Sequence, residues 1–287
     1  MICQICELKI NKICKVVGNV KIFECSNCQL GFLNPKDTIL GRSTRDGNKS
    51  DLYDFKSYKK EENKLRQRYE RLVKIIMKYK KSGNVLDVGS GFGLFSSTLQ
   101  SRGNFNTDLI EPEQKLQYVN KLKFLLYKTT FEKYKNGGKK YDIILMMDVL
   151  EHFRDPLSNL KKAKSLLKKD GILVLQTPNY KSLMARICKD WAWWMIEDHK
   201  FFFSPKSINL LLKKAGFEIE YLTTYEDFED FKKNLDGNFM NIKNELIRKI
   251  TKVVFFTFFI PFYFLTRKIL WQCNFGGLIF LIFRKKN

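Results

Sequence analysis

The stretch Val85-Leu-Asp-Val-Gly-Ser-Gly-Phe-Gly-Leu-Phe-Ser-Ser-Thr-Leu99 decides the fold of this chain. Apolar, β-favouring residues run into three glycines at alternate positions, Gly89, Gly91 and Gly93, and a helix-like apolar pattern follows. This order predicts a strand, a tight turn and a helix, the local geometry of a Rossmann-type nucleotide site. Because glycine has no Cβ, such a turn lets the backbone approach a ligand closely. The turn alone fits a dinucleotide, a phosphate group or no ligand.

Strand and helix patterns alternate through residues 82–180. The alternation predicts an α/β fold whose parallel sheet is covered by helices on both faces. Glu111 follows the second strand, about 20 positions after the glycine turn, where an acidic side chain accepts hydrogen bonds from ribose hydroxyls. Phe131 and Glu132 follow a short third strand, and we expect them beside an adenine.

Two cysteine pairs at the N-terminus predict a metal site. Cys3 and Cys6 form one C-x-x-C knuckle, Cys25 and Cys28 form a second, and residues 7–24 separate the two. Together the knuckles supply four thiolates, which suit a tetrahedral zinc ion. A site with four protein ligands has no open position, so we expect its role to be structural.

The segment between the knuckles has the pattern of a hairpin with its turn at Gly18-Asn19. The sequence begins directly in the cysteine motif, without the charged start and apolar run of a signal peptide. We therefore expect a cytoplasmic, reducing setting, in which paired cysteines hold metal rather than form disulfides.

The chain is strongly basic, since 52 Lys and Arg residues against 30 Asp and Glu residues leave a formal net charge of +22. Such a charge is typical of proteins that contact nucleic acid or anionic membranes. The high lysine content also has a second explanation, a compositional bias of the chain toward Lys, Asn, Ile and Phe. The positive charge is dispersed, and no basic helix or RNA-recognition motif is evident. A nucleic-acid-binding protein is therefore the alternative from another class, and we do not expect nucleic acid as a partner.

Further motifs along the core give the chain a family resemblance. They are Asp87 with the glycine turn, Glu111, Met147-Asp148, Glu151-His152, Asp155-Pro156, Thr177-Pro178-Asn179 and Asp198-His199-Lys200. This series resembles the class I S-adenosylmethionine-dependent methyltransferases. The closer similarity is to ubiquinone-type O-methyltransferases and to methyltransferases of surface-glycan and antibiotic-sugar pathways, many of which carry an N-terminal zinc ribbon.

The resemblance implies a Rossmann-like sheet of seven strands, with the last strand inserted antiparallel beside the fifth. It also implies S-adenosylmethionine as cofactor, with its methionine end in the glycine turn. The implied cofactor-binding residues are Asp87, Gly89, Gly91, Gly93, Glu111, Phe131, Glu132 and Met147.

The expected units of the chain follow from these assignments. They are a zinc ribbon over residues 1–35, a linker and capping helix over 36–81, a methyltransferase core over 82–225, an apolar and basic insert over 226–274, and a final core strand over 275–287.

The chain has two histidines, His152 and His199, and both fall in motifs that flank the cofactor side. An alcohol that accepts a methyl group needs a positioned base, so these are the candidate catalytic residues. Each could instead fix its loop through a hydrogen bond. The motif Asp148, Glu151 and His152 also resembles the divalent-ion site of ubiquinone-type enzymes, and this resemblance implies Mg²⁺ bound there as an alternative.

Three indoles precede the second histidine motif, at Trp191, Trp193 and Trp194. They would stack on an acceptor, lie at a membrane interface or pack on the core. Further along, residues 253–265 form a densely apolar run with basic flanks. The run is too short to span a bilayer, and Pro261 would break a longer helix. We expect it to lie on an anionic membrane surface, with a lid or a dimer contact as the alternatives.

The expected function is methyl transfer from S-adenosylmethionine to a small or lipid-linked acceptor. A sugar hydroxyl in surface-glycan biosynthesis is the leading candidate, by analogy with the sugar-pathway relatives. The alternative acceptor is a quinone-like phenol at the membrane. We expect the protein in the cytoplasm, peripheral to the membrane.

Overall fold

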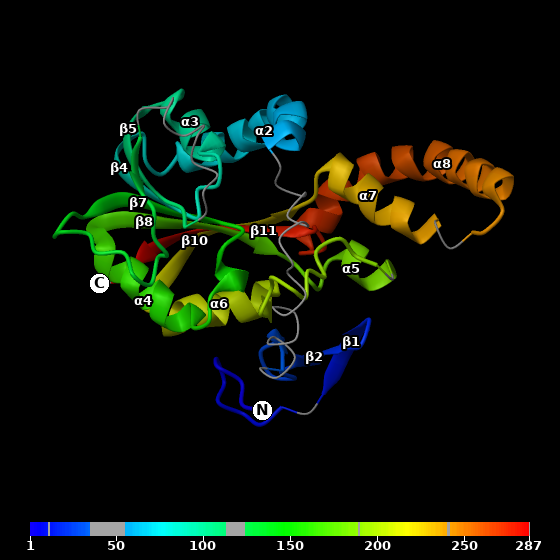
Figure 1. The fold of residues 1–287 in the computed structure, drawn as a ribbon, viewed down its shortest axis with the longest axis horizontal. Coiled ribbons are helices and arrows are strands. Elements are labelled where there is room, and N and C mark those ends of the chain that lie inside the picture. The colour runs from blue at the N-terminus through cyan, green and yellow to red at the C-terminus, as the bar shows by residue number, and fades with distance from the viewer. Residues whose placement is uncertain (11, 35–54, 113–123, 189, 240–241, 287) are drawn as a thin grey trace.

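A seven-stranded sheet lies at the centre of the computed structural model, which describes residues 1–10, 12–34, 55–112, 124–188, 190–239 and 242–286 (Figure 1). The strand order is β10-β11-β8-β7-β4-β5-β6. Neighbours from β8 to β6 are parallel, whereas β11 runs antiparallel to both β8 and β10. The strands are β4 (Ser82–Val88), β5 (Asn104–Ile110), β6 (Leu125–Tyr127), β7 (Tyr141–Met147), β8 (Leu167–Pro178), β10 (Phe217–Tyr225) and β11 (Leu278–Lys285).

Helices cover both faces of this sheet. On one face, α2 (Phe55–Ile76) and α3 (Leu94–Gln100) bury apolar side chains such as Val73 and Leu99 against the strands. On the other, α4 (Pro156–Leu166) and α6 (Pro205–Lys214) do the same through Leu160 and Leu211. The predicted fold class is therefore confirmed, including the antiparallel last strand, in which Leu281 pairs with Leu175 of β8.

The N-terminal segment forms a second, four-stranded sheet. A hairpin of β1 (Ile13–Val17) and β2 (Val20–Glu24) turns at Gly18-Asn19, as predicted, and β2 pairs with β3 (Gly31–Leu33). The fourth strand comes from the core: β9 (Phe201–Phe202) pairs antiparallel with β3. The N-terminal unit is thus joined by backbone hydrogen bonds to the segment that follows His199.

A helical hairpin is inserted between β10 and β11. It consists of α7 (Phe228–Phe239) and α8 (Glu245–Gln272), and it projects beyond the edge of the sheet (Figure 1). The expectation that Pro261 breaks the helix is wrong, because α8 is one helix of 28 residues with Pro261 inside it. A proline costs about 3 kcal/mol within a helix, and aromatic packing on α7, such as Tyr263 against Phe231 at 4.0 Å, opposes that cost. By length and composition, α8 could cross a membrane.

The remaining elements are short connections. They are the 3₁₀ turn η4 (Leu150–His152) and the helix α5 (Leu183–Ile187). The polar linker predicted after Asn34 lies outside the described residues.

Candidate active site

The glycine turn lies at the carboxyl ends of the parallel strands, between β4 and α3. All three glycines have positive φ, at 68° for Gly89, 53° for Gly91 and 71° for Gly93. At Gly89, an added Cβ would lie 2.6 Å from Cγ2 of Val149, so the space as well as the dihedral angle requires glycine. The sequence-based prediction of a tight turn is confirmed.

Glu111 closes this turn from the end of β5. Its Oε2 accepts a hydrogen bond from the backbone N–H of Gly91 at 2.8 Å, and the side chain is only 7% exposed. The backbone N–H of Gly89 donates to the carbonyl of Ile110 at 2.8 Å, which joins the turn to β5. Glu111 and the glycines therefore lie together at the carboxyl edge of the sheet, and we call this group the cradle (Gly89, Gly91, Gly93 and Glu111).

Asp87 lies behind the cradle rather than on its surface. It is 2% exposed, and its carboxyl accepts a hydrogen bond from the hydroxyl of Ser96 at 2.6 Å. Burial raises the pKa of Asp87 to about 7, and the neighbouring Glu111 adds to the increase. The contact ties β4 to α3 and so positions the turn between them.

The other predicted cofactor residues have different surroundings. Phe131 is 2% exposed and stacks on Phe153 with ring centroids 6.1 Å apart, so its ring belongs to the core. Glu132 is exposed, and Met147 ends β7 half-buried. The roles of these three residues toward a cofactor stay predictions.

The two histidines come together at the same carboxyl edge. The ring centroids of His152 and His199 are 4.9 Å apart. Nδ1 of His152 lies 3.1 Å from the carbonyl of Asp198, and Nδ1 of His199 lies 3.2 Å from the carbonyl of Trp193. Because a carbonyl only accepts, each Nδ1 carries the proton, and in the neutral ring each Nε2 carries a lone pair.

Burial keeps His199 neutral. The side chain is 3% exposed, and desolvation together with the nearby His152 lowers its pKa to about 3. Glu151 beside it is 1% exposed and accepts a hydrogen bond from Thr177 at 3.0 Å. Burial, and secondarily Asp148, raises the pKa of Glu151 well above its ordinary value. The carboxyl edge of the sheet therefore holds a neutral imidazole, His199, next to a carboxyl group, Glu151, that favours its protonated form.

The group that could hold a second metal differs from the predicted one. Ligand atoms of Glu151, His152 and His199 lie within 4.8 Å of one another. Asp148 is outside this group, and its Oδ2 accepts a hydrogen bond from Gln176 at 2.7 Å. Two imidazoles and one carboxylate suit a transition metal better than Mg²⁺, which prefers oxygen ligands. The donor set therefore does not fit the magnesium alternative.

A buried polar network beside Asp148 was not predicted from the sequence. The hydroxyl of Tyr225 donates to Gln176, which in turn donates to Asp148. Asp148 has a φ of 55°, which is unusual for a residue with a side chain. Arg68 of α2 pairs with Asp227 and Asp230, and burial raises the pKa of Asp148 to about 6 while Arg68 opposes the increase.

The four N-terminal cysteines form a compact cluster, which we call the cysteine cage (Cys3, Cys6, Cys25 and Cys28). Their sulfur atoms lie within 4.8 Å of one another, and no disulfide joins them. Sγ of Cys3 lies 3.5 Å from Sγ of Cys28, and the pKa of Cys3 falls to about 5 chiefly through that contact. A tetrahedral zinc ion with Zn–S bonds of about 2.3 Å requires sulfur separations of about 3.8 Å. The cage fits such an ion.

A family model described as a methyltransferase domain matches residues 58–222. The chain belongs to this family. The match runs from α2 to β10 and so includes the cradle, the histidine pair and most of the central sheet.

Relatives of the methyltransferase domain agree with the fold. A ubiquinone biosynthesis O-methyltransferase of Actinobacillus pleuropneumoniae is 35% identical over 106 residues, which are 33% of this chain and 45% of that protein. The aligned stretch thus spans about half the length of that relative. A possible histamine N-methyltransferase of Thermotoga maritima superimposes with a TM-score of 0.54 at 18% identity over 81% of this chain and 94% of its own.

Coclaurine N-methyltransferase, solved with N-methylheliamine and SAH, superimposes with a TM-score of 0.51 at 16% identity. The superposition covers 77% of this chain and 71% of that enzyme. At such identities these structures show the fold of the methyltransferase domain, which is the class I fold expected from the sequence.

Proposed function

We propose that the chain is an S-adenosylmethionine-dependent O-methyltransferase whose acceptor is a small or lipid-linked molecule, with a sugar hydroxyl as the leading candidate. The observation that carries the proposal is the cradle, in which Glu111 and three positive-φ glycines lie together at the carboxyl edge of the sheet. The carboxylate is positioned to accept hydrogen bonds from ribose hydroxyls, and the bare turn accommodates the methionine end. Family membership supports the same cofactor.

Methyl transfer requires the protein to align the acceptor with the methyl group, because the methyl donor is already activated. When bound, S-adenosylmethionine supplies a methyl group on a positively charged sulfur, which is a good leaving group. The acceptor hydroxyl oxygen attacks the methyl carbon in line as the carbon–sulfur bond breaks, so the protein must hold the two in register and exclude water.

His199 is the proposed base for this step. Its neutral Nε2 accepts a hydrogen bond from the acceptor hydroxyl and then takes the proton as the new ether forms. A pKa of about 3 makes His199 a weak base. The protonated ether produced by the transfer is a much stronger acid than the starting alcohol, so a weak base suffices. The low pKa also keeps the imidazole neutral at physiological pH.

A structural zinc ion in the cysteine cage is part of the proposal. The four thiolates match the donor set and spacing of closed zinc sites. Such an ion would hold β3, and through β3 the β9 strand next to His199, in place.

Membrane attachment through α8 is also proposed, and it favours a lipid-linked acceptor. Large apolar side chains line the outer face of α8, including Val253 at 66%, Phe258 at 76% and Leu265 at 79% exposure. Lys249, Lys252, Arg267 and Lys268 lie at the two ends of the apolar stretch in the sequence, and their charge complements anionic lipid. Packing on α7 supports a helix lying on the surface, because a spanning α8 would carry the charged side chains of α7 into the bilayer.

A quinone-like phenol is the second candidate acceptor. The relatives named as ubiquinone biosynthesis O-methyltransferases favour it. Transfer of radiolabelled methyl groups to a panel of sugars, lipid-linked sugars and catechols would distinguish the two acceptor classes.

The central test is calorimetry with S-adenosylmethionine on the wild type and on Glu111→Ala. Loss of the charged hydrogen-bond acceptor should weaken binding about tenfold or more. Glu61→Ala, which removes an exposed carboxylate of α2, is the matched control and should bind as the wild type does. A wild type that does not bind S-adenosylmethionine would overturn the proposal.

A further inference from the structure

The loop after β6, which we call the β6 loop (residues 128–135), starts beside the cradle and reaches the turn η4. The carbonyl of Tyr127, at the end of β6, accepts a hydrogen bond from the backbone N–H of Glu111 at 3.2 Å. The ring of Phe131 lies 6.1 Å from that of Phe153, which directly follows η4. The β6 loop contains no helix or strand, so other contacts must hold its backbone.

One side chain from α4 holds the β6 loop. Nζ of Lys162 donates hydrogen bonds to the carbonyl oxygens of Phe131, Glu132 and Tyr134, at 2.6, 3.0 and 2.8 Å. An ammonium group has three hydrogens, so all of its donors are used on backbone oxygens of one loop. The same Nζ lies 5.1 Å from the centre of the Phe131 ring, whose face attracts a cation. Lys162 therefore fixes the direction of three peptide groups.

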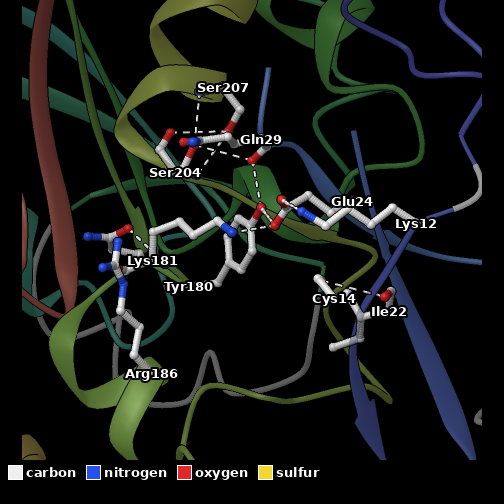
Figure 2. Close-up of polar contacts among 11 residues, drawn as sticks. Lys12, Cys14, Ile22, Glu24, Gln29, Tyr180, Lys181, Arg186, Ser204 and Ser207 are labelled. Carbon is white, nitrogen blue, oxygen red and sulfur yellow. Dashed lines mark hydrogen bonds and ion pairs between the residues drawn. The ribbon is translucent and has the colours of Figure 1, made fainter. Parts of the chain in front are cut away.

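Lys162 differs from the half-buried lysines that form ion pairs. Nζ of Lys181, for example, contacts the carboxylate of Glu24, which Lys12 also reaches (Figure 2). Such a lysine neutralises a charge, whereas Lys162 brings its charge to neutral carbonyl groups. Burial lowers the pKa of Lys162, and the nearby Glu132 opposes the decrease. An ammonium group that loses water without a carboxylate partner costs free energy, and a requirement for an ordered loop accounts for that cost.

The three bonds also determine where the β6 loop presents a hydrogen-bond donor. In a trans peptide, the carbonyl and the N–H point in opposite directions. The carbonyl of Phe131 faces Lys162, so the N–H of Glu132, which belongs to the same peptide group, points away from α4. Within the part of the chain that the structure describes, this N–H forms no backbone hydrogen bond. It can therefore donate to a ligand that lies against the loop.

We propose that Lys162 is a positioning residue for the cofactor: its ammonium group orders the β6 loop, and the ordered loop contacts the adenosine part of S-adenosylmethionine. The inference rests on the proposed function, since it assigns a part of the same cofactor site beyond the cradle. Lys162 acts through the loop rather than by contacting the cofactor. Without its ammonium group, the loop must be ordered when the cofactor binds, and the lost conformational entropy weakens the affinity.

The test is calorimetric titration of the full chain with S-adenosylmethionine. Lys162→Met keeps an aliphatic side chain against Phe131 but removes the three donors, and it should weaken binding about tenfold. Two control variants should bind as the wild type does. Lys161→Met removes an exposed lysine one position earlier on α4. Lys181→Met removes a half-buried lysine that follows β8, which is four strand positions, or about 19 Å, from β6.

Ammonium rescue separates a hydrogen-bonding role of Lys162 from simple packing. In Lys162→Ala, ammonium chloride should restore most of the affinity for S-adenosylmethionine, because NH₄⁺ supplies the missing donors to the three carbonyl groups. Tetramethylammonium chloride at the same ionic strength carries the charge without a donor and should restore none. If both salts or neither of them restored binding, Lys162 would act through charge or packing alone, and the proposal would be wrong.

Hydrogen exchange without the cofactor distinguishes this proposal from the proposed function. Peptides that cover the β6 loop should exchange faster in Lys162→Met than in the wild type, and peptides that cover β8 should not change. Suppose that the wild type binds S-adenosylmethionine while Lys162→Met shows unchanged affinity or unchanged exchange. The role of Lys162 is then refuted and the proposed function stands. A wild type that does not bind this cofactor removes both.

Discussion

Asp87 shows how a motif residue can act through its neighbours. Sequence comparison of motifs places it with the cofactor-binding residues, yet its carboxyl is buried and bonded to Ser96. With a pKa raised to about 7 by burial, the folded chain holds a proton there that the unfolded chain releases near pH 4. Folding is therefore favoured by this group at low pH, and its contribution falls as the pH rises toward 7.

Asp87→Asn should remove that pH dependence. We expect the wild type to lose about 2 kcal/mol of unfolding free energy from this group between pH 5 and pH 7, whereas the variant keeps the amide neutral throughout. Urea unfolding at both pH values measures the difference. If the free energy of unfolding changed with pH by the same amount in both proteins, Asp87 would be ionised in the folded chain.

The residues that were predictable from sequence are those with local signals. Gly89 and Glu111 follow strands at spacings that determine their place at the carboxyl edge. Tyr225 and Arg68 gave no such signal, because their partners Gln176 and Asp227 are brought to them by the tertiary fold. The sequence placed His152 and His199 on the cofactor side of the sheet, but it did not predict that their rings would be in contact.

At the scale of elements, α8 differs most from expectation. Pro261 favoured a short apolar segment, but the intrinsic cost of proline competes with aromatic contacts along a whole helix. Those contacts depend on α7, whose approach to α8 could not be derived from periodicity. The result is a helix about 42 Å long whose exposed apolar side chains run from Leu246 to Ile269, rather than a patch over residues 253–265.

The exposed face of α8 should bind vesicles that contain anionic lipid. Replacing Phe258 and Leu265 together by Ser should lower partitioning about tenfold or more, because two large apolar side chains no longer leave water. Leu125→Ser changes an equally apolar side chain, 56% exposed on β6, and should leave partitioning unchanged. Cosedimentation with vesicles measures the effect, and equal losses in both variants would contradict a specific face.

At the scale of the whole molecule, contacts between distant segments connect its parts. Arg68 of α2 lies 12% exposed between Asp227 and Asp230 at the start of the α7–α8 hairpin. Arg71, one turn further along α2, also reaches Asp227 at 2.8 Å but is 62% exposed. Arg68 and Arg71 therefore allow a buried ion pair to be compared with an exposed one on the same helix.

Arg68→Met should destabilise the chain by about 3 kcal/mol, because it leaves the partly buried Asp230 without its cation and leaves Asp227 with only the exposed Arg71. Arg71→Met should cost less than about 1 kcal/mol, since exposed pairs contribute little. Denaturant midpoints of the two variants check both values. Equal effects would mean that the Arg68 cluster is solvated.

The pairing of β3 with β9 connects the cysteine cage to His199. A two-residue strand has no sequence pattern, so this contact between the N-terminal unit and the core was not predictable. Loss of the proposed zinc ion should therefore affect more than residues 1–35. We expect zinc removal by a chelator to raise hydrogen exchange at residues 199–203, where the N–H of Lys200 also bonds Glu151.

The same experiment contains its control. Peptides covering β4 and the cradle share no strand with the N-terminal sheet, so their protection should be unchanged on chelation. Unchanged exchange at residues 199–203 would show that the cage and the histidine loop are independent.

The hairpin of α7 and α8 leaves and rejoins the sheet at a single cross-strand pair. Tyr225 ends β10 and Leu278 begins β11 directly opposite it, so the entry and exit points are about 5 Å apart. Strands so placed need only a two-residue turn to connect them. The helical hairpin within the 226–277 segment is therefore an insertion whose length and sequence can change while the register of β10 and β11 is preserved, as long as Asp227 and Asp230 remain to pair with Arg68. A change in the membrane attachment proposed for α8 would then require no change in the strands of the central sheet.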